Sequence, residues 1–151
     1  MSKTQSLLVP NPALLLDNQL CFALYSTSLA MTKLYQPLLK ALGLTYPQYL
    51  VMLVLWESDG ISVSELGERL FLDSGTLTPL LKRLQHAGLL QRQRSAADER
   101  RVQLVLSSAG QALREQAKLV PQCVLEAVDC PLPELIDLTR QMQQLRTKLL
   151  A

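Results

Sequence analysis

The sequence predicts a mainly α-helical protein that carries one small β-hairpin. Three observations support this fold class. Leucines and other apolar residues recur at helical spacing along most of the 151 residues. Two short runs with strand-like alternation flank a polar turn at residues 95–98. Capping residues, glycines and prolines separate the segments. The length suits a single domain that is large enough to bury a core.

Residues 61–88 are predicted to form two helices joined by a tight turn. Ser62 followed by Glu65 is a capping-box pair, which marks the start of the first helix. The second helix is expected to begin at Asp73 or Ser74, because both residue types cap helix N-termini. Its apolar face consists of four leucines, Leu77, Leu80, Leu81 and Leu84.

A β-hairpin follows the second helix. Gly88 stands where a helix commonly ends in the left-handed conformation. Residues 89–94 and 102–106 then alternate as two short strands. A helix, a turn, a helix and a hairpin in this order make a winged helix-turn-helix, a fold that places its second helix in the major groove of DNA.

The exposed residues of this region suit DNA. Small hydroxyls near the start of the second helix fit base edges, and cations further along fit phosphates. The candidate DNA-binding residues on this helix are Ser74, Thr76, Thr78, Lys82 and Arg83. Those on the hairpin are Arg92, Arg94, Asp98, Arg100 and Arg101. Six basic and two acidic side chains give residues 82–101 a net charge of +4, whereas the whole chain carries +2. A solvated charged hairpin is the alternative, which the adjacent helix pair disfavours.

The flanking segments are predicted to be helices within a single domain of residues 1–151. Residues 15–44 and 108–151 form the dimerisation region in this prediction, and residues 45–107 form the winged helix-turn-helix. The terminal helices carry apolar stripes that the small central part cannot cover, so a homodimer is expected. Its two-fold symmetry suits a palindromic operator in double-stranded DNA. A monomer with a folded-back helical cap is the alternative.

Prolines mark the expected bends in these flanking helices. Pro37 predicts a kink, or a break into two helices, in the helical pattern of residues 15–42. Pro121 predicts a kink in a later helix that begins at Ser107 or Ser108.

The sequence gives no sign of a membrane or secreted protein. Residues 50–56 are apolar on every face of a helix, which predicts a buried central helix, but the run is too short to span a membrane. Residues 1–10 lack a secretory signal pattern. Residues 1–13 are polar with two prolines, which predicts a mobile segment. A cytoplasmic location is expected, where thiols stay reduced.

Motifs of common enzymes are missing. The sequence has no Gly-rich phosphate loop, no Gly-x-Ser-x-Gly and no Cys-x-x-Cys, and its single histidine, His86, lies on the DNA-facing helix. The three cysteines and this histidine match no common zinc site. We therefore expect no enzymatic activity, no cofactor and no metal, and a metal-sensing repressor is a distant alternative.

Cys21 is the candidate reactive group. Asp17 or Asn18 would cap the helix that contains it, which places Cys21 in the first turn or just beyond. The unpaired amides and the dipole of a helix N-terminus favour a thiolate over a thiol. The alternative is a buried, unreactive cysteine between Leu20 and Phe22.

Four stretches of the sequence resemble a known family. The pattern Asp98-x-Arg100-x5-Leu106-Ser107 resembles the wing signature of the MarR family of dimeric bacterial repressors, in which the Asp braces the wing and the Arg supports or contacts DNA. The Cys21 stretch, the segment KLYQPLLKALGLTYPQYLVMLVLWE and the helix LDSGTLTPLLKRL resemble the OhrR subgroup, which senses organic hydroperoxides. The resemblance implies a redox-sensing repressor that releases its operator when Cys21 is oxidised.

The resemblance also implies residue roles. In the OhrR subgroup, two tyrosines of the partner subunit hydrogen-bond the sulfur of the N-terminal cysteine, and by position these are Tyr35 and Tyr46. Phenolic donors would stabilise the thiolate and keep it ready to attack the peroxide. Tyr25 and Tyr49 match less clearly, and ordinary packing is the alternative for all four tyrosines.

In two-cysteine members of the subgroup, the oxidised cysteine condenses with a late cysteine of the other subunit. Cys123 and Cys130 lie in that region, on either side of the usual position near Glu126. Cys123 is about one helical turn from Glu126, which slightly favours it, and an inert role for either cysteine stays open. Two alternative functions also remain: a MarR-type repressor released by a reversible small aromatic ligand in the dimer crevice, and an architectural DNA-binding protein without a signal.

Overall fold

The computed structural model describes residues 11–151 and confirms the predicted mainly helical fold with one hairpin. Two short 3-10 turns, η1 (Pro12–Leu14) and η2 (Leu16–Asn18), precede the first helix. The α-helices are α1 (Leu20–Lys40), α2 (Tyr46–Glu57), α3 (Val63–Leu70), α4 (Ser74–His86), α5 (Ser108–Ala117), α6 (Leu119–Val128) and α7 (Leu132–Leu150). The strands are β1 (Leu90–Arg94) and β2 (Val102–Leu106). A mobile segment was predicted over residues 1–13, of which residues 1–10 lie outside the described residues.

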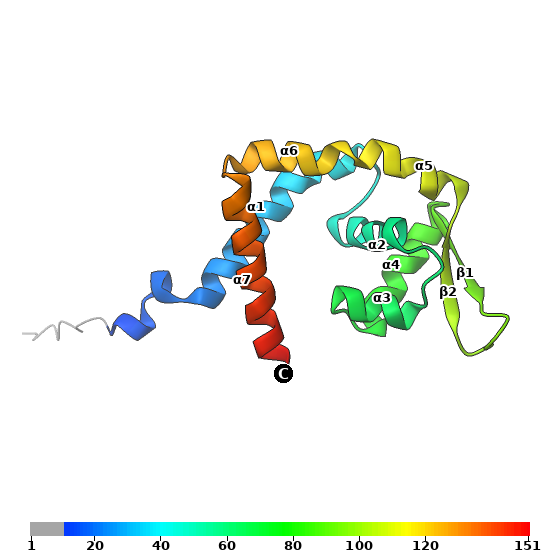
Figure 1. Cartoon of the computed structure of the whole chain (residues 1–151), viewed down its shortest axis with the longest axis horizontal. Coiled ribbons are helices and arrows are strands. Elements are labelled where there is room, and N and C mark those ends of the chain that lie inside the picture. The colour runs from blue at the N-terminus through cyan, green and yellow to red at the C-terminus, as the bar shows by residue number, and fades with distance from the viewer. Residues whose placement is uncertain (1–10) are drawn as a thin grey trace, which may run out of the picture.

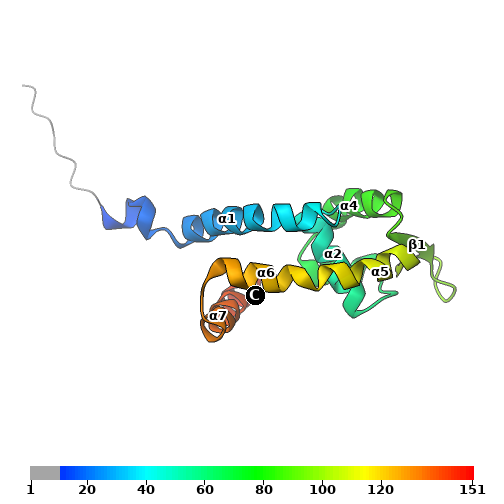
Figure 2. The same ribbon diagram turned by 90° about the horizontal axis from the view of Figure 1, so that it is seen from above.

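The elements divide into a compact head and a set of long helices. Figure 1 shows α2, α3, α4 and the β1–β2 hairpin gathered at one end of the molecule, with α7 standing apart from them. Seen from above in Figure 2, α1 and α6 run side by side, and these two helices are in contact. None of the helices in residues 11–151 combines the length and the apolar character that crossing a membrane requires.

Local capping fixes the helices of the head. The Ser62 hydroxyl accepts a hydrogen bond from the Glu65 amide and the Glu65 carboxylate accepts one from the Ser62 amide, so the predicted capping box is present. Asp73, rather than Ser74, caps α4, with its carboxylate 2.7 Å from the Thr76 amide nitrogen. These bonds satisfy amides that the helix itself leaves unpaired.

The hairpin is attached to the segment that precedes α3. β1 and β2 pair antiparallel, with Leu90 opposite Leu106 and Arg94 opposite Val102. The amide of Leu104 donates to the carbonyl of Ile61 at 2.8 Å, so β2 pairs on its other side with the chain entering α3. This pairing fixes the hairpin relative to the two helices of the head.

Leucines from every element of the head form the core. Leu66, Leu77, Leu81, Leu84, Leu90 and Leu104 are all buried, and they pack against Val51, Met52 and Leu55 of α2. Burial of one such side chain stabilises the fold by about 1.5–3 kcal/mol. α2 lies between α1 and the other helices of the head, as its uniformly apolar sequence predicted.

The start of α1 differs from the prediction. The helix begins at Leu20 rather than near residue 15, and Gln19 occupies the N-cap position instead of Asp17 or Asn18. The Asn18 side chain donates to the carbonyl of Pro12 at 2.8 Å, which stabilises a 3-10 turn in place of a helical first turn.

The expected break at Pro37 is also absent, because α1 continues through this residue to Lys40. Pro37 is exposed and its neighbour Leu39 is 1% exposed in the core, so packing of the following turn holds the chain helical. Near the second predicted bend, Lys118 separates α5 from α6 but keeps helical backbone angles. Pro121 lies in the first turn of α6, where proline is tolerated. Ser107, one of the two predicted caps, begins α5.

Gly110 provides a test of the contact between the hairpin and α5. A Cβ atom at this position would overlap the carbonyl oxygen of Leu89, and the Gly110 carbonyl accepts a bond from the Trp56 indole at 2.9 Å. Gly110→Ala should therefore lower the free energy of unfolding by about 1–3 kcal/mol, the usual cost of overpacking. Urea denaturation at a fixed protein concentration measures the loss.

Gly75→Ala is the matched control, because its Cβ would meet nothing closer than 3.4 Å and its helical position favours alanine. Equal stability changes in the two variants would contradict the proposed role of Gly110.

Candidate functional site

α4 presents a polar face opposite its buried leucines. Thr76, Lys82 and Arg83 are exposed on this face. Thr78 is half-buried, and its hydroxyl already donates to the carbonyl of Ser74 at 2.7 Å. Thr76, Lys82 and Arg83 are thus more accessible to a ligand than Thr78.

The turn of the hairpin is closed by Asp98. Its carboxylate accepts a hydrogen bond from the Arg100 amide, and its carbonyl accepts one from the Arg101 amide, both at 3.0 Å. The Ser95 amide donates to the Arg101 carbonyl at 2.8 Å, which completes the turn. Asp98 therefore has the bracing geometry that the sequence resemblance implied. Its carboxylate contacts the backbone amide of Arg100 rather than the Arg100 side chain.

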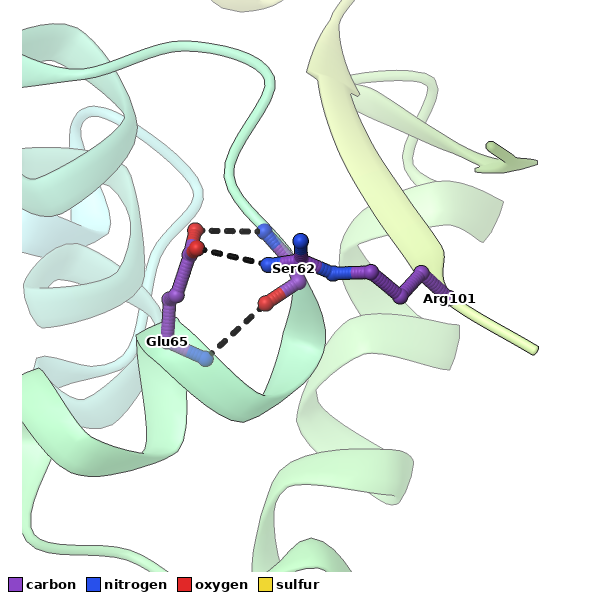
Figure 3. Close-up of polar contacts among 3 residues, drawn as sticks. All are labelled: Ser62, Glu65 and Arg101. Atoms are coloured by element: carbon purple, nitrogen blue, oxygen red, sulfur yellow. Dashed lines mark hydrogen bonds and ion pairs between the residues drawn. The ribbon is translucent and has the colours of Figure 1, made fainter. Parts of the chain in front are cut away.

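Arg101 has a different environment from the other arginines of the hairpin. Its guanidinium lies 2.8 Å from one carboxylate oxygen of Glu65, while the other oxygen accepts the bond from the Ser62 amide (Figure 3). Arg101 therefore ties the hairpin to the start of α3. Glu65 was predicted only as a capping residue, and its pairing with Arg101, which is 36 residues away, has no local sequence signal.

A second side-chain bond joins the hairpin to α4. The Arg92 guanidinium donates to the Gln85 side chain at 3.0 Å. Gln85 was not among the predicted site residues. Arg94 and Arg100 form no ion pair with another described residue, and the same holds for Lys82 and Arg83 on α4.

A hollow of about 270 Å³ lies where α3, α4 and the hairpin meet. Its lining includes three arginines and three hydroxyl side chains: Arg92, Arg100, Arg101, Ser62, Ser64 and Thr78. The structure thus brings the cations of the hairpin next to the predicted recognition helix, on one surface suited to an anion.

Cys21 is the second residue of α1, and its side chain is exposed. The Gln19 side chain makes no capping bond, so the first amides of α1 are not paired by a cap. The location in the first turn agrees with the prediction, whereas a cysteine buried within its own chain is not observed. An exposed thiol at a helix N-terminus is open to a reactant and to a partner chain.

Tyr35 and Tyr46 lie together, as the sequence resemblance implied, and Tyr49 joins them. Their ring centroids are separated by 5.0 Å (Tyr35 to Tyr46), 5.9 Å (Tyr35 to Tyr49) and 6.3 Å (Tyr46 to Tyr49). Burial raises the pKa of all three phenols, and the neighbouring phenols raise the pKa of Tyr35 and Tyr49 further. The hydroxyls therefore keep their protons at neutral pH and are available as hydrogen-bond donors.

The tyrosine cluster is too far from the cysteine of its own chain to contact it. Cys21 and Tyr35 belong to the same continuous helix and are 14 residues apart. At a rise of 1.5 Å per residue, the separation along the axis is about 21 Å. A contact between this cysteine and this cluster therefore requires two chains.

Cys123 and Cys130 are both partly buried but differ in their surroundings. The Cys130 thiol donates to a carboxylate oxygen of Glu134 at 3.4 Å. Partial burial raises the pKa of Cys130, and the bond to Glu134 and the charges of Glu134 and Asp129 raise it further. Cys130 is thus held as a thiol by a neighbouring carboxylate. Cys123 lies on α6 next to the buried Val124 and has no hydrogen bond to a described carboxylate.

The long helices leave a large apolar surface uncovered. A groove of about 900 Å³ runs between α1, α6 and α7, with Met31, Val124, Leu138 and Met142 among its lining residues. α7 buries no residue against the rest of the described chain. Its guanidinium at Arg146 does reach the head, 4.1 Å from the ring centroid of Phe71 in the turn between α3 and α4.

The capped helices α3 and α4, the turn between them and the basic hairpin that follows define the protein as a winged helix-turn-helix DNA-binding protein. Residues 33–116 match the family described as transcriptional regulator SarA/Rot. The organic hydroperoxide resistance transcriptional regulator of Bacillus subtilis is 53% identical over 110 residues, which are 73% of this chain and 75% of that protein. The regulator SarZ of Staphylococcus saprophyticus is 38% identical over 133 residues, 88% of this chain and 91% of that one.

Solved structures agree with these relatives. AbfR of Staphylococcus epidermidis superposes with a TM-score of 0.76 and 36% identity, over 89% of this chain and 93% of that chain. Reduced AbfR bound to DNA gives a TM-score of 0.73 and 35% identity, over 90% and 95% of the two chains. The chain belongs to the MarR family of transcriptional regulators, in its OhrR subgroup. These relatives are regulators rather than enzymes.

Proposed function

We propose that this protein is a redox-sensing transcriptional repressor that binds a palindromic operator as a homodimer and releases it when an organic hydroperoxide oxidises Cys21. The observation that carries the proposal is the exposed Cys21 in the first turn of α1, in a chain 53% identical to an organic hydroperoxide resistance regulator. The location that follows is the cytoplasm, where the DNA and reduced thiols are found.

The reading surface of this repressor consists of α4 and the hairpin. Thr76 and Lys82 reach base edges in the major groove, while Ser74, Thr78 and Arg83 approach the adjacent backbone. Arg94 and Arg100 contact phosphates or the minor groove, because they have no ion-pair partner among the described residues. Arg92 also faces DNA, and its bond to Gln85 holds its side chain beside α4. Asp98 and Arg101 stabilise the hairpin.

A second copy of the chain covers the apolar groove between α1, α6 and α7. The uncovered groove and the lack of buried residues on α7 support this dimer. Two-fold symmetry then presents two α4 helices to successive major grooves, which lie about 34 Å apart. The same symmetry supplies the second chain that contact between Cys21 and the tyrosine cluster requires.

The chemical step is attack of the Cys21 thiolate on the hydroperoxide. The sulfur bonds to one peroxide oxygen, the O–O bond breaks, and the other oxygen leaves and takes up a proton as an alcohol. Tyr35 and Tyr46 of the partner subunit donate hydrogen bonds that stabilise the thiolate before the attack. Their raised pKa values support this role, because the donors keep their protons.

A second cysteine then resolves the sulfenic acid. Its sulfur displaces the hydroxyl group as water and forms an intersubunit disulfide, which requires Cα atoms within about 7 Å. We assign this role to Cys123 of the partner subunit, because the carboxylate of Glu134 and partial burial hold Cys130 as a thiol. Formation of the bond would shift α1 relative to α6 and rotate the two heads out of register with the DNA.

Release by a reversible small aromatic ligand is the second candidate function, and the large apolar groove favours it. The two functions differ in their need for Cys21. Only the redox switch is lost in Cys21→Ser, whereas a ligand-released repressor would keep its response.

The arginines of the hairpin test the reading surface. Arg94→Ala should weaken binding to an operator fragment selected from random duplexes and lower the salt slope of log K by about one unit, without changing the unfolding free energy. Arg101→Ala should instead lower stability by at most about 1 kcal/mol, because its pair with Glu65 is half-exposed. Fluorescence anisotropy at several salt concentrations measures the slopes. The assignment is wrong if Arg94→Ala and Arg100→Ala both bind with an unchanged slope.

The cysteine variants test the switch. Cumene hydroperoxide should abolish operator binding by the wild type and leave binding by Cys21→Ser intact, since only the former has the attacking sulfur. Mass spectrometry should find the first added oxygen on Cys21. Non-reducing electrophoresis should show a cross-linked dimer in the wild type and in Cys130→Ser, and none in Cys123→Ser.

Two results would change this scheme. A cross-link lost only in Cys130→Ser would assign resolution to Cys130. Release of DNA by the wild type without any cross-link would replace the disulfide with a one-cysteine mechanism, while Cys21 keeps its role.

The tyrosine hydroxyls can be removed without removing the rings. Tyr35→Phe and Tyr46→Phe should leave reduced operator binding near normal and slow the reaction of Cys21 with hydroperoxide. Each lost bond to a charged sulfur should slow it by about ten- to a hundredfold, because such a bond contributes about 1.5–3 kcal/mol. Stopped-flow mixing measures the rate, and Tyr25→Phe is the control, since Tyr25 lies outside the cluster. A double variant that reacts at the wild-type rate would reject the role of both hydroxyls.

A further inference from the structure

Three tyrosines from two helices form one aromatic cluster, and Tyr49 is its buried member. Tyr49 is 3% exposed, whereas Tyr35 and Tyr46 are only partly buried at the edge of the core. The ring of Tyr49 lies within about 6 Å of both other rings, the range in which tilted aromatic rings attract one another. The buried ring of Tyr49 is therefore the aromatic wall of the cluster, the surface against which the rings of Tyr35 and Tyr46 pack.

α2 holds this wall in a fixed place. Thr45 and Gln48 form a capping box at the start of α2, in which the Gln48 side chain accepts from the Thr45 amide at 2.9 Å. Tyr46 and Tyr49 are three residues apart, so their side chains lie on the same face of the helix. Tyr46 is the first residue of α2, where the helix alone constrains a side chain least, and contact with Tyr49 supplies the missing constraint.

Tyr35 reaches the cluster from a different helix. It lies on α1, which packs against α2, and its ring contacts Tyr46 and Tyr49. Without the ring of Tyr49, Tyr35 and Tyr46 would border a cavity into which either ring could turn. Tyr49 therefore determines where both hydroxyls lie relative to the surface of the chain.

We propose that Tyr49 is a positioning residue of the redox switch, whose ring fixes the Tyr35 and Tyr46 hydroxyls that serve Cys21 of the partner subunit. The inference rests on the redox function proposed above. Tyr49 acts only through the other two tyrosines and contacts neither the thiol nor the peroxide. The effect is large because a hydrogen bond weakens steeply as its distance and angle depart from the optimum.

Two variants separate the ring of Tyr49 from its hydroxyl. Tyr49→Phe keeps the aromatic wall, and Tyr49→Leu keeps an apolar side chain but removes the wall. Alkylation of Cys21 by iodoacetamide across a range of pH should be unchanged in Tyr49→Phe, and its profile should move to higher pH in Tyr49→Leu. At neutral pH the reaction of Tyr49→Leu with cumene hydroperoxide should slow roughly tenfold, the size expected when a bond to a charged group is lost. Operator binding by both reduced variants should match the wild type.

A merely structural role is tested by Leu55→Ala. Leu55 is 1% exposed on the same helix, two turns beyond Tyr49, so its truncation loosens α2 away from the tyrosines. If Leu55→Ala shifts the alkylation profile as far as Tyr49→Leu, general loosening is the cause and the proposal is wrong. If Tyr49→Phe is as slow as Tyr49→Leu, the hydroxyl acts instead of the ring and the proposal is again wrong. Tyr49→Met replaces Tyr49→Leu if the latter does not fold.

The alkylation profile also separates this proposal from the function on which it rests. Iodoacetamide reports the thiolate without any peroxide. A wild type that hydroperoxides do not oxidise would reject the redox function, and a shifted profile in Tyr49→Leu would still support the positioning role. An oxidisable wild type with identical profiles in all variants would reject the positioning role alone.

Discussion

The carboxylate of Glu65 joins two parts of the head on which the reading surface depends, the start of α3 and the hairpin. One oxygen closes the capping box of α3 through the Ser62 amide, and the other binds the Arg101 guanidinium at the turn end of the hairpin. The adjacent backbone pairs with β2 through Ile61 and Leu104. A recognition helix and a wing read DNA together only if their separation is fixed, and this junction, with the leucine core beneath it, fixes the separation.

Features of the fold that arise from local chemistry could be predicted, and those that arise from distant contacts could not. The Ser62–Glu65 capping box and the leucine face of α4 depend on residues within one or two turns, so their patterns are visible in the sequence. Pro37 was predicted to kink the helix or to break it into two helices. The break is absent, because burial of Leu39 in the core outweighs one missing backbone bond. The predicted start of α1 was wrong because the Asn18 side chain donates a hydrogen bond to the Pro12 carbonyl, six residues earlier, which the helical pattern does not reveal.

The candidate site divides in the same way. Cys21 lies in the first turn as predicted, although Asp17 and Asn18, the residues predicted to cap the helix, do not occupy the N-cap position. The proximity of Tyr35 and Tyr46 followed from the family resemblance. The third tyrosine of the cluster, Tyr49, depends on the packing of α1 against α2, which no single-helix pattern contains. A hairpin arginine is available for DNA or ties the hairpin to α3, depending on whether a carboxylate lies near it. That question is settled by Glu65, which is remote in sequence from Arg101.

A redox event at α1 and α6 must reach α4 and the hairpin, and the connections between these elements are stiff. α5 and α6 follow one another nearly in line, with Lys118 between them in helical backbone geometry (Figure 1). α5 is anchored to the head at both sides of its first turn, since the Ser107 hydroxyl donates to the Gly88 carbonyl and the Trp56 indole to the Gly110 carbonyl. A displacement of α6 therefore turns the head as one body instead of being absorbed in a loop.

α7 gives a second connection, because the guanidinium of Arg146 lies over the ring of Phe71 at the turn before α4. Phe71 has a left-handed backbone with φ of 57°, a conformation that residues other than glycine seldom adopt. Contacts of the surrounding structure therefore fix the conformation of this turn. An interface that changes on oxidation thus acts on the head from α5 and from α7. Two connections restrain the orientation of a rigid body better than one, and the proposed switch needs such restraint. An operator read by two helices about 34 Å apart is lost through small rotations of either head.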